Sequence, residues 1–363
     1  MKKILFVSNN QFGYLIDTLK YCEYLGELYE IQIVCVDNGL PKIENQNIVV
    51  HYIQNDNKYT KRIKFAKITK GIAAHFNPNL IFVDYFVGCS TIKLYLGNKY
   101  TYNLDIRTGA ISKNKIVRKT KNLILKLEAY LFSNVSIISK HLQKHLKINS
   151  LKVHKLPLGA DKNIFEKSAD MQYEDEKLKL IYVGTLYERK IEQTILGISI
   201  FMSKYRDSAA NITYDIIGYS KNSEDEKIIE KYIVDLNLED VVVNHGKLEY
   251  TKAMGFVSKA DIGISYIPIT EYFNFQPPTK TFEYLLSGLP CIATNTFENA
   301  QIINTTNGIL IADTPEGFCE GLNDIITKFE GYNKGKIVNS VSTFTWENII
   351  LNNLNPYLKS IIK

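Results

Sequence analysis

Residues 276–294 read QPPTKTFEYLLSGLPCIAT and contain the pattern on which the rest of the chain is built. Two prolines stiffen the approach to a predicted helix over 279–287, with Thr279 as its expected N-cap. A Gly-Leu-Pro turn then leads into a short apolar run, 290–294, which predicts a buried strand. A helix that turns directly into a buried strand is the repeating unit of a parallel α/β sheet.

Strands and helices alternate in this way in both halves of the chain, separated by a polar stretch over 156–179 that reads as an interdomain linker. Before the linker we expect strands within 2–10 and at 31–37, 79–86, 100–106 and 134–139, with helices at 14–28 and 116–132. After it we expect strands at 178–184, 212–218, 241–246, 262–267, 290–294 and 308–313, with helices at 190–205, 224–236, 250–259, 279–287, 315–329 and 345–362. The fold class is therefore α/β, with two doubly wound, Rossmann-like domains facing a central cleft. Ligands of such sheets bind outside the carboxyl ends of the strands.

The composition describes an ordinary globular protein, with 45% hydrophobic and 23% charged residues. The 5 cysteines stand apart from one another, which argues against a disulfide framework or a cysteine-rich zinc site. No apolar run approaches the roughly 18 residues of a membrane span, and the basic start MKKILFVSNN is too short in its apolar part for a signal peptide. We therefore expect a reduced, soluble, cytoplasmic protein.

Charge is distributed unevenly, with a net +14 in residues 1–160 and −8 in 161–363. Two lysine-rich runs, 58–70 and 113–126, hold most of the excess and interleave it with apolar residues. Three interpretations stay open: two solvated helix faces, a basic surface resting on anionic lipid, or a nucleic-acid site. Nucleic acid is the least favoured because neither run carries a recognisable nucleic-acid motif.

Missing motifs narrow the chemistry. SNNQFG follows the first strand where a dinucleotide-binding protein has G-x-G-x-x-G, and there is no P-loop, H-E-x-x-H or G-x-S-x-G. His141 and His145 stand i, i+4 among lysines without a carboxylate, so a solvated face is favoured over a metal site. No two aspartates lie two apart, and we expect no metal and no cofactor.

Two segments of the second half suit a phosphate. The start of the 279–287 helix offers free N–H groups, Lys280 adds a full charge, and Glu283 is placed to accept hydrogen bonds from vicinal hydroxyls such as those of a ribose. In YVGTLYERKI (182–191), Arg189 and Lys190 stand at the start of the next helix. The alternatives are an ordinary capped helix and a pair of surface charges, but two such helix starts in one domain favour a diphosphate site.

The second half resembles the donor domain of nucleotide-sugar glycosyltransferases with the GT-B fold. The resemblance lies in the order of its motifs, which are strand–GT–x4–Lys, IIGYS, VNHGKL, ADIGISYIP, PPTKTFEYLLSGLPCIAT and NGILIAD. The closest resemblance is to the retaining type often called family four. HKLPLGADKNIF (154–165) resembles the crossover of that family, and FTWENIILNNLNPYL (344–358) resembles its final helix, which returns to the first domain. The resemblance implies an acceptor-side domain over 1–160, completed by 345–363, and a donor domain over 161–344.

The resemblance also implies roles for individual residues. Lys190 matches the basic residue on the donor diphosphate, and Glu283 the second glutamate of the E-x7-E motif, which holds the donor ribose. The catalytic candidates that the resemblance gives in this chain are Arg189 and Lys190. The donor-binding candidates are Gly184, Thr185, Gly218, His245, Gly246, Lys247, Gln276, Pro278, Thr279, Lys280, Thr281 and Glu283.

The chain departs from the family pattern at three places. Thr185 replaces an arginine, for which Arg189 is the expected substitute, and Gln276 replaces the first glutamate of E-x7-E, which normally contacts the transferred sugar. The glycine-rich loop after the first strand is reduced to Gly13.

No clear counterpart of the family's first-domain histidine is present. Asp105 is therefore a candidate for orienting or deprotonating the acceptor hydroxyl, at a strand end that we expect to face the cleft. Its neighbour Arg107, with Asn10 and Gly13, completes the acceptor-side candidates. A structural Asp–Arg pair is the equal alternative.

We therefore expect a glycosyltransferase that moves a sugar from a nucleotide-diphosphate sugar to a hydroxyl acceptor, with retention implied by the resemblance alone. The basic first domain favours a glycan or glycolipid acceptor of surface-polysaccharide assembly and a peripheral position on the inner face of the cell membrane. The alternatives are a non-hydrolysing sugar-nucleotide epimerase, which would need cleft carboxylates not found in the first domain, and an inactive nucleotide-binding module.

Overall fold

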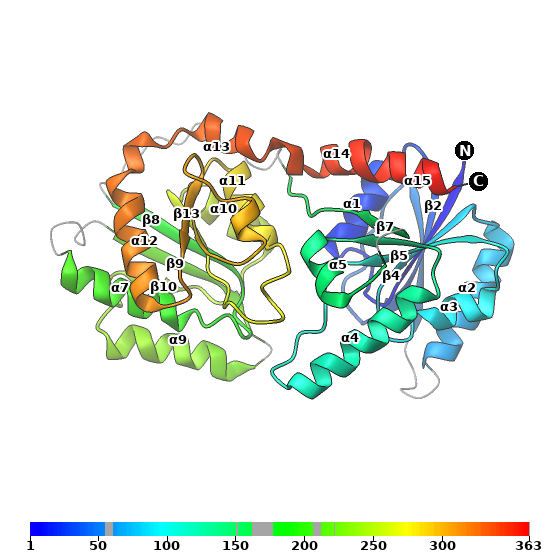
Figure 1. Ribbon diagram of the computed structural model, residues 1–363, viewed down its shortest axis with the longest axis horizontal. Coiled ribbons are helices and arrows are strands. Elements are labelled where there is room, and N and C mark those ends of the chain that lie inside the picture. Colours follow the sequence, from blue (N-terminus) through cyan, green and yellow to red (C-terminus); the bar gives the residue numbers. More distant parts are fainter. Residues whose placement is uncertain (55–60, 150–151, 162–176, 206–211, 221, 363) are drawn as a thin grey trace. The chain divides into compact units, whose positions relative to one another are not determined.

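The computed structural model describes residues 1–363 except 55–60, 150–151, 162–176, 206–211, 221 and 363. The chain divides into two compact units, each with its own sheet (Figure 1). Unit 1 comprises Met1–Gly159 and Trp346–Lys363, and unit 2 comprises Ala160–Thr345. The part of the predicted linker that falls on 162–176 lies outside the described residues.

Unit 1 is built on a parallel sheet of seven strands in the order β3-β2-β1-β4-β5-β6-β7. The strands are β1 (Lys3–Ser8), β2 (Glu30–Asp37), β3 (Ile48–Gln54), β4 (Leu80–Asp84), β5 (Thr101–Ile106), β6 (Asn134–Ile137) and β7 (Val153–Lys155). Strand β1 lies between β2 and β4, which makes it a topological switch point. Strands β3 and β7 were not expected: β3 mixes exposed and buried positions, and β7 is only three residues long.

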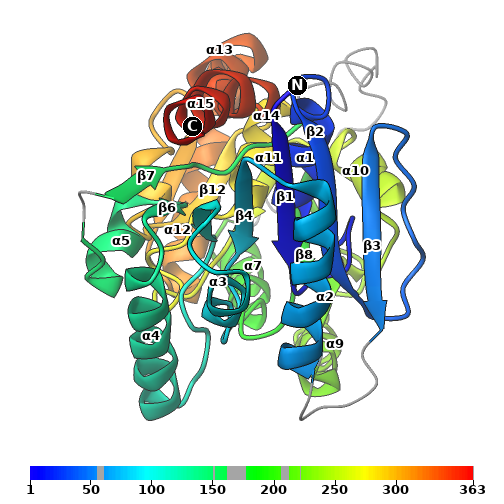
Figure 2. The ribbon, with the colours of Figure 1, turned by 90° about the vertical axis from the view of Figure 1, so that its right-hand side faces the viewer.

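The helices of unit 1 are α1 (Ile16–Leu25), α2 (Lys61–Phe76), α3 (Ser90–Leu96), α4 (Lys115–Tyr130) and α5 (Lys140–Leu146). Because the chain crosses the sheet from β1 to β2 in one direction and from β3 onward in the other, α1 lies on the opposite face from α2 and α3. Helices α3 and α4 are joined by Glu128, which accepts hydrogen bonds from the Gly88 and Ser90 amides. Figure 2 shows this side of unit 1.

The C-terminal segment completes unit 1 on the α1 face. It runs through α14 (Trp346–Ile349), a π-helical turn, η5 (Ile350–Leu354), and α15 (Asn355–Ile361). Trp346 packs edge-on against Tyr21 of α1, and Asn355 accepts a hydrogen bond from the Tyr29 hydroxyl. Only glycine fits at position 159 beside Trp346, because a Cβ at Gly159 would lie 2.8 Å from the Trp346 ring.

Unit 2 contains a parallel sheet of six strands in the order β10-β9-β8-β11-β12-β13. The strands are β8 (Leu178–Thr185), β9 (Ile212–Tyr219), β10 (Val242–Asn244), β11 (Ile262–Ser265), β12 (Cys291–Thr294) and β13 (Gly308–Ile311). The helices are α7 (Glu192–Lys204), α9 (Ser223–Asp235), α10 (Tyr250–Val257), α11 (Thr279–Leu286), α12 (Pro315–Thr327) and α13 (Lys334–Ser340). Short 3-10 turns follow at Asn299–Gln301, Phe329–Gly331 and Ser342–Phe344.

The expected α/β class, with parallel strands and intervening helices, is confirmed in both units. In unit 2, α7 and α12 pack against each other over one face of the sheet, and their contact is close enough that Gly197 of α7 leaves no room for a Cβ beside Phe318. Helix α11 covers the other face beside β11 and β12. The predicted cleft between the two domains stays a prediction.

Candidate functional site

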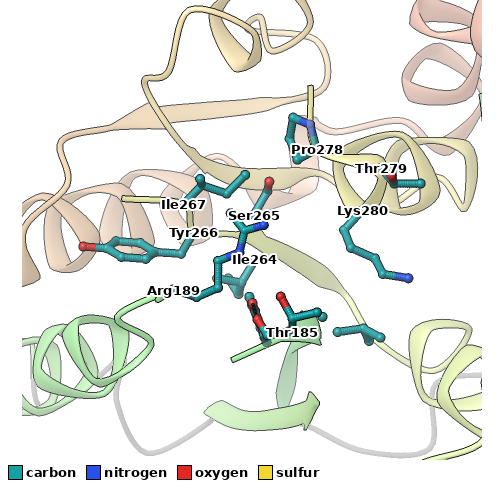
Figure 3. A pocket seen from close by; sticks show the side chains of 12 residues that line it. Thr185, Arg189, Ile264, Ser265, Tyr266, Ile267, Pro278, Thr279 and Lys280 are labelled. Atoms are coloured by element: carbon teal, nitrogen blue, oxygen red, sulfur yellow. Dashed lines mark hydrogen bonds between the residues drawn. The ribbon is translucent and has the colours of Figure 1, made fainter. Parts of the chain in front are cut away.

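A pocket of about 220 Å³ opens in unit 2 where the carboxyl ends of β8 and β11 meet the start of α11. Figure 3 shows Thr185 and Arg189 on one side of this space and Pro278, Thr279 and Lys280 on the other. The residues that line it are Tyr182, Val183, Gly184, Thr185, Arg189, Ile264, Ser265, Tyr266, Ile267, Pro278, Thr279 and Lys280. The pocket therefore lies at the edge of the sheet where ligands of doubly wound domains bind.

Helix α11 is held rigidly against the two strands. The Tyr284 hydroxyl accepts a hydrogen bond of 2.8 Å from the Val183 amide, and the Thr281 and Ser265 hydroxyls lie 2.7 Å apart, both buried. Gly263 permits this approach, because a Cβ there would lie 2.4 Å from the Tyr284 ring. The start of α11 is thus fixed over the end of β11 before any ligand arrives.

The start of α11 is suited to an anion. Pro278, not Thr279, occupies the N-cap position, and no side chain caps the helix, which corrects the sequence prediction. Thr279 is the first helical residue, so the amides of the first turn have no intrahelical partner and carry the positive end of the helix dipole. Lys280, in the first turn, also lines the pocket.

Lys280 and Glu283 form an ion pair of 2.5 Å one turn apart on α11. Glu283 is almost fully buried, at 7% exposure, whereas the Lys280 side chain is 30% exposed. The glutamate therefore positions the lysine, and its carboxylate is close to the pocket without lining it. Its role toward a ribose stays a prediction.

Arg189 supplies a second cation from the turn between β8 and α7. Its guanidinium lies 4.0 Å from the centroid of the Phe273 ring, and burial lowers the pKa of Arg189 from its ordinary value. The turn is tight, because Glu188 and Lys190 both adopt left-handed φ angles, of 58° and 51°. Adjacent side chains consequently diverge: Arg189 lines the pocket, whereas Lys190 is exposed and does not. The diphosphate role of Lys190 stays a prediction.

The other donor-side candidates lie around the pocket. Gly218 is in contact with β8, since a Cβ there would lie 2.1 Å from the Gly184 carbonyl oxygen, and its amide donates to Gly246. His245 pairs with Asp215 at 2.5 Å and packs at a tilt against the Phe256 ring, beyond the residues that line the pocket. Lys247 lies over the Tyr219 ring. The Gln276 side chain donates to the Tyr272 carbonyl and so holds its own loop.

Several pocket residues were not expected from the sequence. Ser265, Tyr266 and Ile267 line the pocket at the end of β11, and the only signal for them is their place at a strand end within ADIGISYIP. Phe273, the ring under Arg189, belongs to an aromatic loop with no spacing that would single it out.

On the acceptor side, Asp105 and Arg107 have little exposed surface, and their roles toward an acceptor stay predictions. Asp105 is 1% exposed and accepts a 2.6 Å hydrogen bond from Ser136. Arg107 pairs with Asp17 at 2.5 Å and donates to the Leu156 carbonyl. The structural Asp–Arg pair, the alternative left open by the sequence, is the one observed, because the end of β5 is covered by α1 and the chain leaving β7.

A buried acidic cluster results in unit 1. Burial raises the pKa of Asp105 to about 7, and Arg107 opposes that rise. Burial likewise raises the pKa of Asp84 to about 6, against the hydrogen bonds from Thr18 and Ser8. Burial alone would lower the pKa of Arg107, but Asp17 and the other anionic neighbours hold it above its ordinary value. The cluster therefore contributes to the stability of unit 1 in a pH-dependent way.

The loop after β1 contains the remaining acceptor-side candidates. Asn10 is exposed, and Gly13 has a left-handed φ of 92° with Ile43 directly above it. The buried Gln11 was not expected: its side chain accepts from the Asn38 and Leu40 amides and fixes the 38–41 loop. Within the described ranges, no group of three His, Cys, Asp or Glu side chains is arranged to hold a metal ion.

Comparison with known proteins places unit 2 beside a known family. Residues 177–328 match the family model of Glycosyl transferases group 1, and this span contains the whole pocket. Unit 2 thus matches a glycosyltransferase family model, and the chain as a whole has the GT-B fold. The recognition made from the sequence motifs is thereby confirmed. A search of curated proteins by sequence finds no match.

Solved structures resemble this protein over nearly its whole length. Sucrose-phosphate synthase from Thermosynechococcus elongatus superposes with a TM-score of 0.78 at 15% identity, covering 99% of both chains. A glycosyltransferase from Rickettsia africae gives 0.75 at 16% identity, covering 100% of this chain and 99% of the other. HepE of Anabaena, in complex with UDP and glucose, gives 0.76 at 13% identity, covering 99% and 100%. At these identities the likeness concerns the fold.

Proposed function

We propose that this glycosyltransferase transfers a sugar from a nucleotide-diphosphate sugar to an acceptor hydroxyl, with retention of the anomeric configuration and without a bound metal. The observation that carries the proposal is the convergence of the α11 N-terminus, Lys280 and Arg189 on one pocket. UDP in the complex of the HepE relative supports a nucleoside diphosphate as the donor's leaving group.

The reaction breaks the bond between the sugar C1 and a phosphate oxygen and forms a bond from C1 to the acceptor oxygen, and the proton of the acceptor hydroxyl passes to the departing diphosphate. Negative charge accumulates on the leaving diphosphate as the first bond breaks. Fixed positive groups aimed at that charge stabilise the transition state more than the ground state. Here the first-turn amides of α11, Lys280 and Arg189 supply them, and the ion pair with Glu283 orients Lys280 in advance.

For the acceptor we propose a glycan or glycolipid of surface-polysaccharide assembly, reached from the cytoplasmic side of the membrane. The net +14 charge of residues 1–160 supports an acceptor that is anionic or is presented at an anionic surface. Among the described residues no helix has the length and apolar character of a bilayer span.

The donor proposal is tested by calorimetric titration with UDP, GDP and ADP, followed by nucleoside diphosphate release from the matching sugars. We expect Lys280→Met to weaken binding of the preferred diphosphate about 5- to 30-fold, because a partly exposed charged hydrogen bond contributes on the order of 1–2 kcal/mol. Lys259→Met is the matched control, because Lys259 is an exposed lysine of unit 2 that does not line the pocket. Equal affinities of both variants and the wild type would refute the donor site.

A further inference from the structure

Helix α4 of unit 1 exposes a line of large apolar side chains. Ile116, Leu123, Leu127 and Tyr130 are 76%, 55%, 56% and 50% exposed. Their spacing, i, i+7, i+11 and i+14, places them within about 60° of one another around the helix. We call these four residues the α4 ridge. Both views show α4 at the outside of unit 1 (Figures 1 and 2).

The α4 ridge lies opposite the face by which α4 packs on the unit. The buried face consists of Arg118, Leu125, Glu128 and Ala129. These positions fall about half a turn away from the ridge on the helix. Core packing therefore does not account for the ridge, and an amphipathic surface helix normally presents polar residues there.

The charges beside the ridge have one sign. Lys115, Lys119 and Lys126 follow one flank of the ridge, and none of them takes part in an ion pair among the described residues. The only carboxylate of the helix, Glu128, is buried and is used by the Gly88 and Ser90 amides. The exposed surface of α4 is thus apolar and cationic, with no negative charge.

A cationic depression adjoins the C-terminal end of α4. It measures about 560 Å³, and its lining includes Lys93 and Lys99 but no aspartate or glutamate. Lys93 donates to the carbonyl of Leu131, directly after α4, and Lys152 donates to the carbonyl of Ala129. The positive surface therefore continues past the end of the ridge into a concave site, where a phosphate group would meet ammonium groups and hydroxyls.

We propose that α4 docks this glycosyltransferase on an anionic lipid bilayer. The helix lies in the plane of the headgroups, the α4 ridge enters the boundary with the acyl chains, and the flanking lysines contact lipid phosphates. An apolar line with lysines along one flank fits such an interface, because apolar burial and attraction to anionic lipid add to each other. Only the purpose of this docking, which is to bring the enzyme to a lipid-linked acceptor, rests on the proposed function.

The test is co-sedimentation of the full-length enzyme with phosphatidylcholine vesicles, with and without added phosphatidylglycerol. We expect binding only to the anionic vesicles, weakened by salt. The double variant Leu123→Gln/Leu127→Gln should lose about tenfold or more in vesicle affinity. Val234→Gln/Val243→Gln, which alters two apolar residues of unit 2 with 58% and 46% exposure, is the matched control and should bind like the wild type.

Nucleoside diphosphate affinity, measured without vesicles, should be unchanged in both double variants, which separates a failure of this proposal from a failure of the donor site. Equal binding of the wild type to neutral and anionic vesicles would overturn the proposal. The proposal would also be overturned if the wild type did not bind vesicles but associated with itself in solution, and if Leu123→Gln/Leu127→Gln abolished that association. The ridge would then be an interface between two copies of the chain.

Discussion

The buried carboxyl of Asp84 should make the stability of unit 1 increase as the pH falls. Asp84 is 4% exposed, and one of its oxygens, Oδ1, has no hydrogen-bond partner among the described residues. Burial raises its pKa from 3.8 to about 6, whereas the unfolded chain keeps the ordinary value. The folded state therefore binds the proton more tightly, and this contribution is fully present below the unfolded pKa and is lost as the pH rises through 6.

The magnitude follows from that difference in pKa. One pKa unit corresponds to about 1.4 kcal/mol, so the full effect is on the order of 3 kcal/mol, of which about 2 kcal/mol develops between pH 8 and pH 4.5. Asp84→Asn keeps an acceptor for the Thr18 hydroxyl and removes the titration. The side-chain amide of the Asp84→Asn variant lacks a second hydrogen-bond partner, which lowers the stability of the variant by a similar amount at every pH. This loss therefore cancels when the stabilities at two pH values are compared.

The assay is urea unfolding followed by tryptophan fluorescence. Trp346 is the only tryptophan of the chain and is buried in unit 1 against Tyr21, so it reports on this unit. Relative to the wild type, Asp84→Asn should gain about 2 kcal/mol more at pH 8 than at pH 4.5. Glu27→Gln, a change at an exposed carboxylate of the same unit, is the control. If the Asp84→Asn and wild-type stability curves run parallel with pH, the reasoning is refuted.

Three further substitutions test the pocket of unit 2. Gly218→Ala adds a Cβ 2.1 Å from a backbone oxygen of β8, so we expect a loss of several kcal/mol in thermal unfolding and of nucleotide binding, and an unchanged melting temperature would contradict the packing. Tyr284→Phe leaves the buried Val183 amide without its acceptor, which should cost about 1–3 kcal/mol in chemical denaturation while the ring still fills its place. Arg189→Gln should weaken nucleoside diphosphate binding about tenfold in calorimetry and more than Lys190→Gln does, and the reverse order would assign the site cation to Lys190.

The sequence alone determined the α/β class and the position of the proposed anion site. Buried parallel strands are continuous apolar runs, and their boundaries are marked by glycine and proline, so NLIFVDYF and GILIAD could be interpreted without tertiary contacts. The α11 start was equally accessible, because Pro277, Pro278 and Lys280 are local features of a helix N-terminus. Strand β3 was missed because its exposed positions break the apolar run.

Only the tertiary structure decided which charged side chains are available for chemistry. Asp105 and Arg107 follow a strand like any active-site pair, but α1 and the segment after β7 cover them, and burial depends on residues distant in the sequence. Arg189 and Lys190 are neighbours in the chain, yet two left-handed residues in their turn send one side chain into the pocket and leave the other exposed. The α4 ridge is likewise apolar in the sequence, and its exposure became visible only once Leu125 and Ala129 were seen to occupy the packed face.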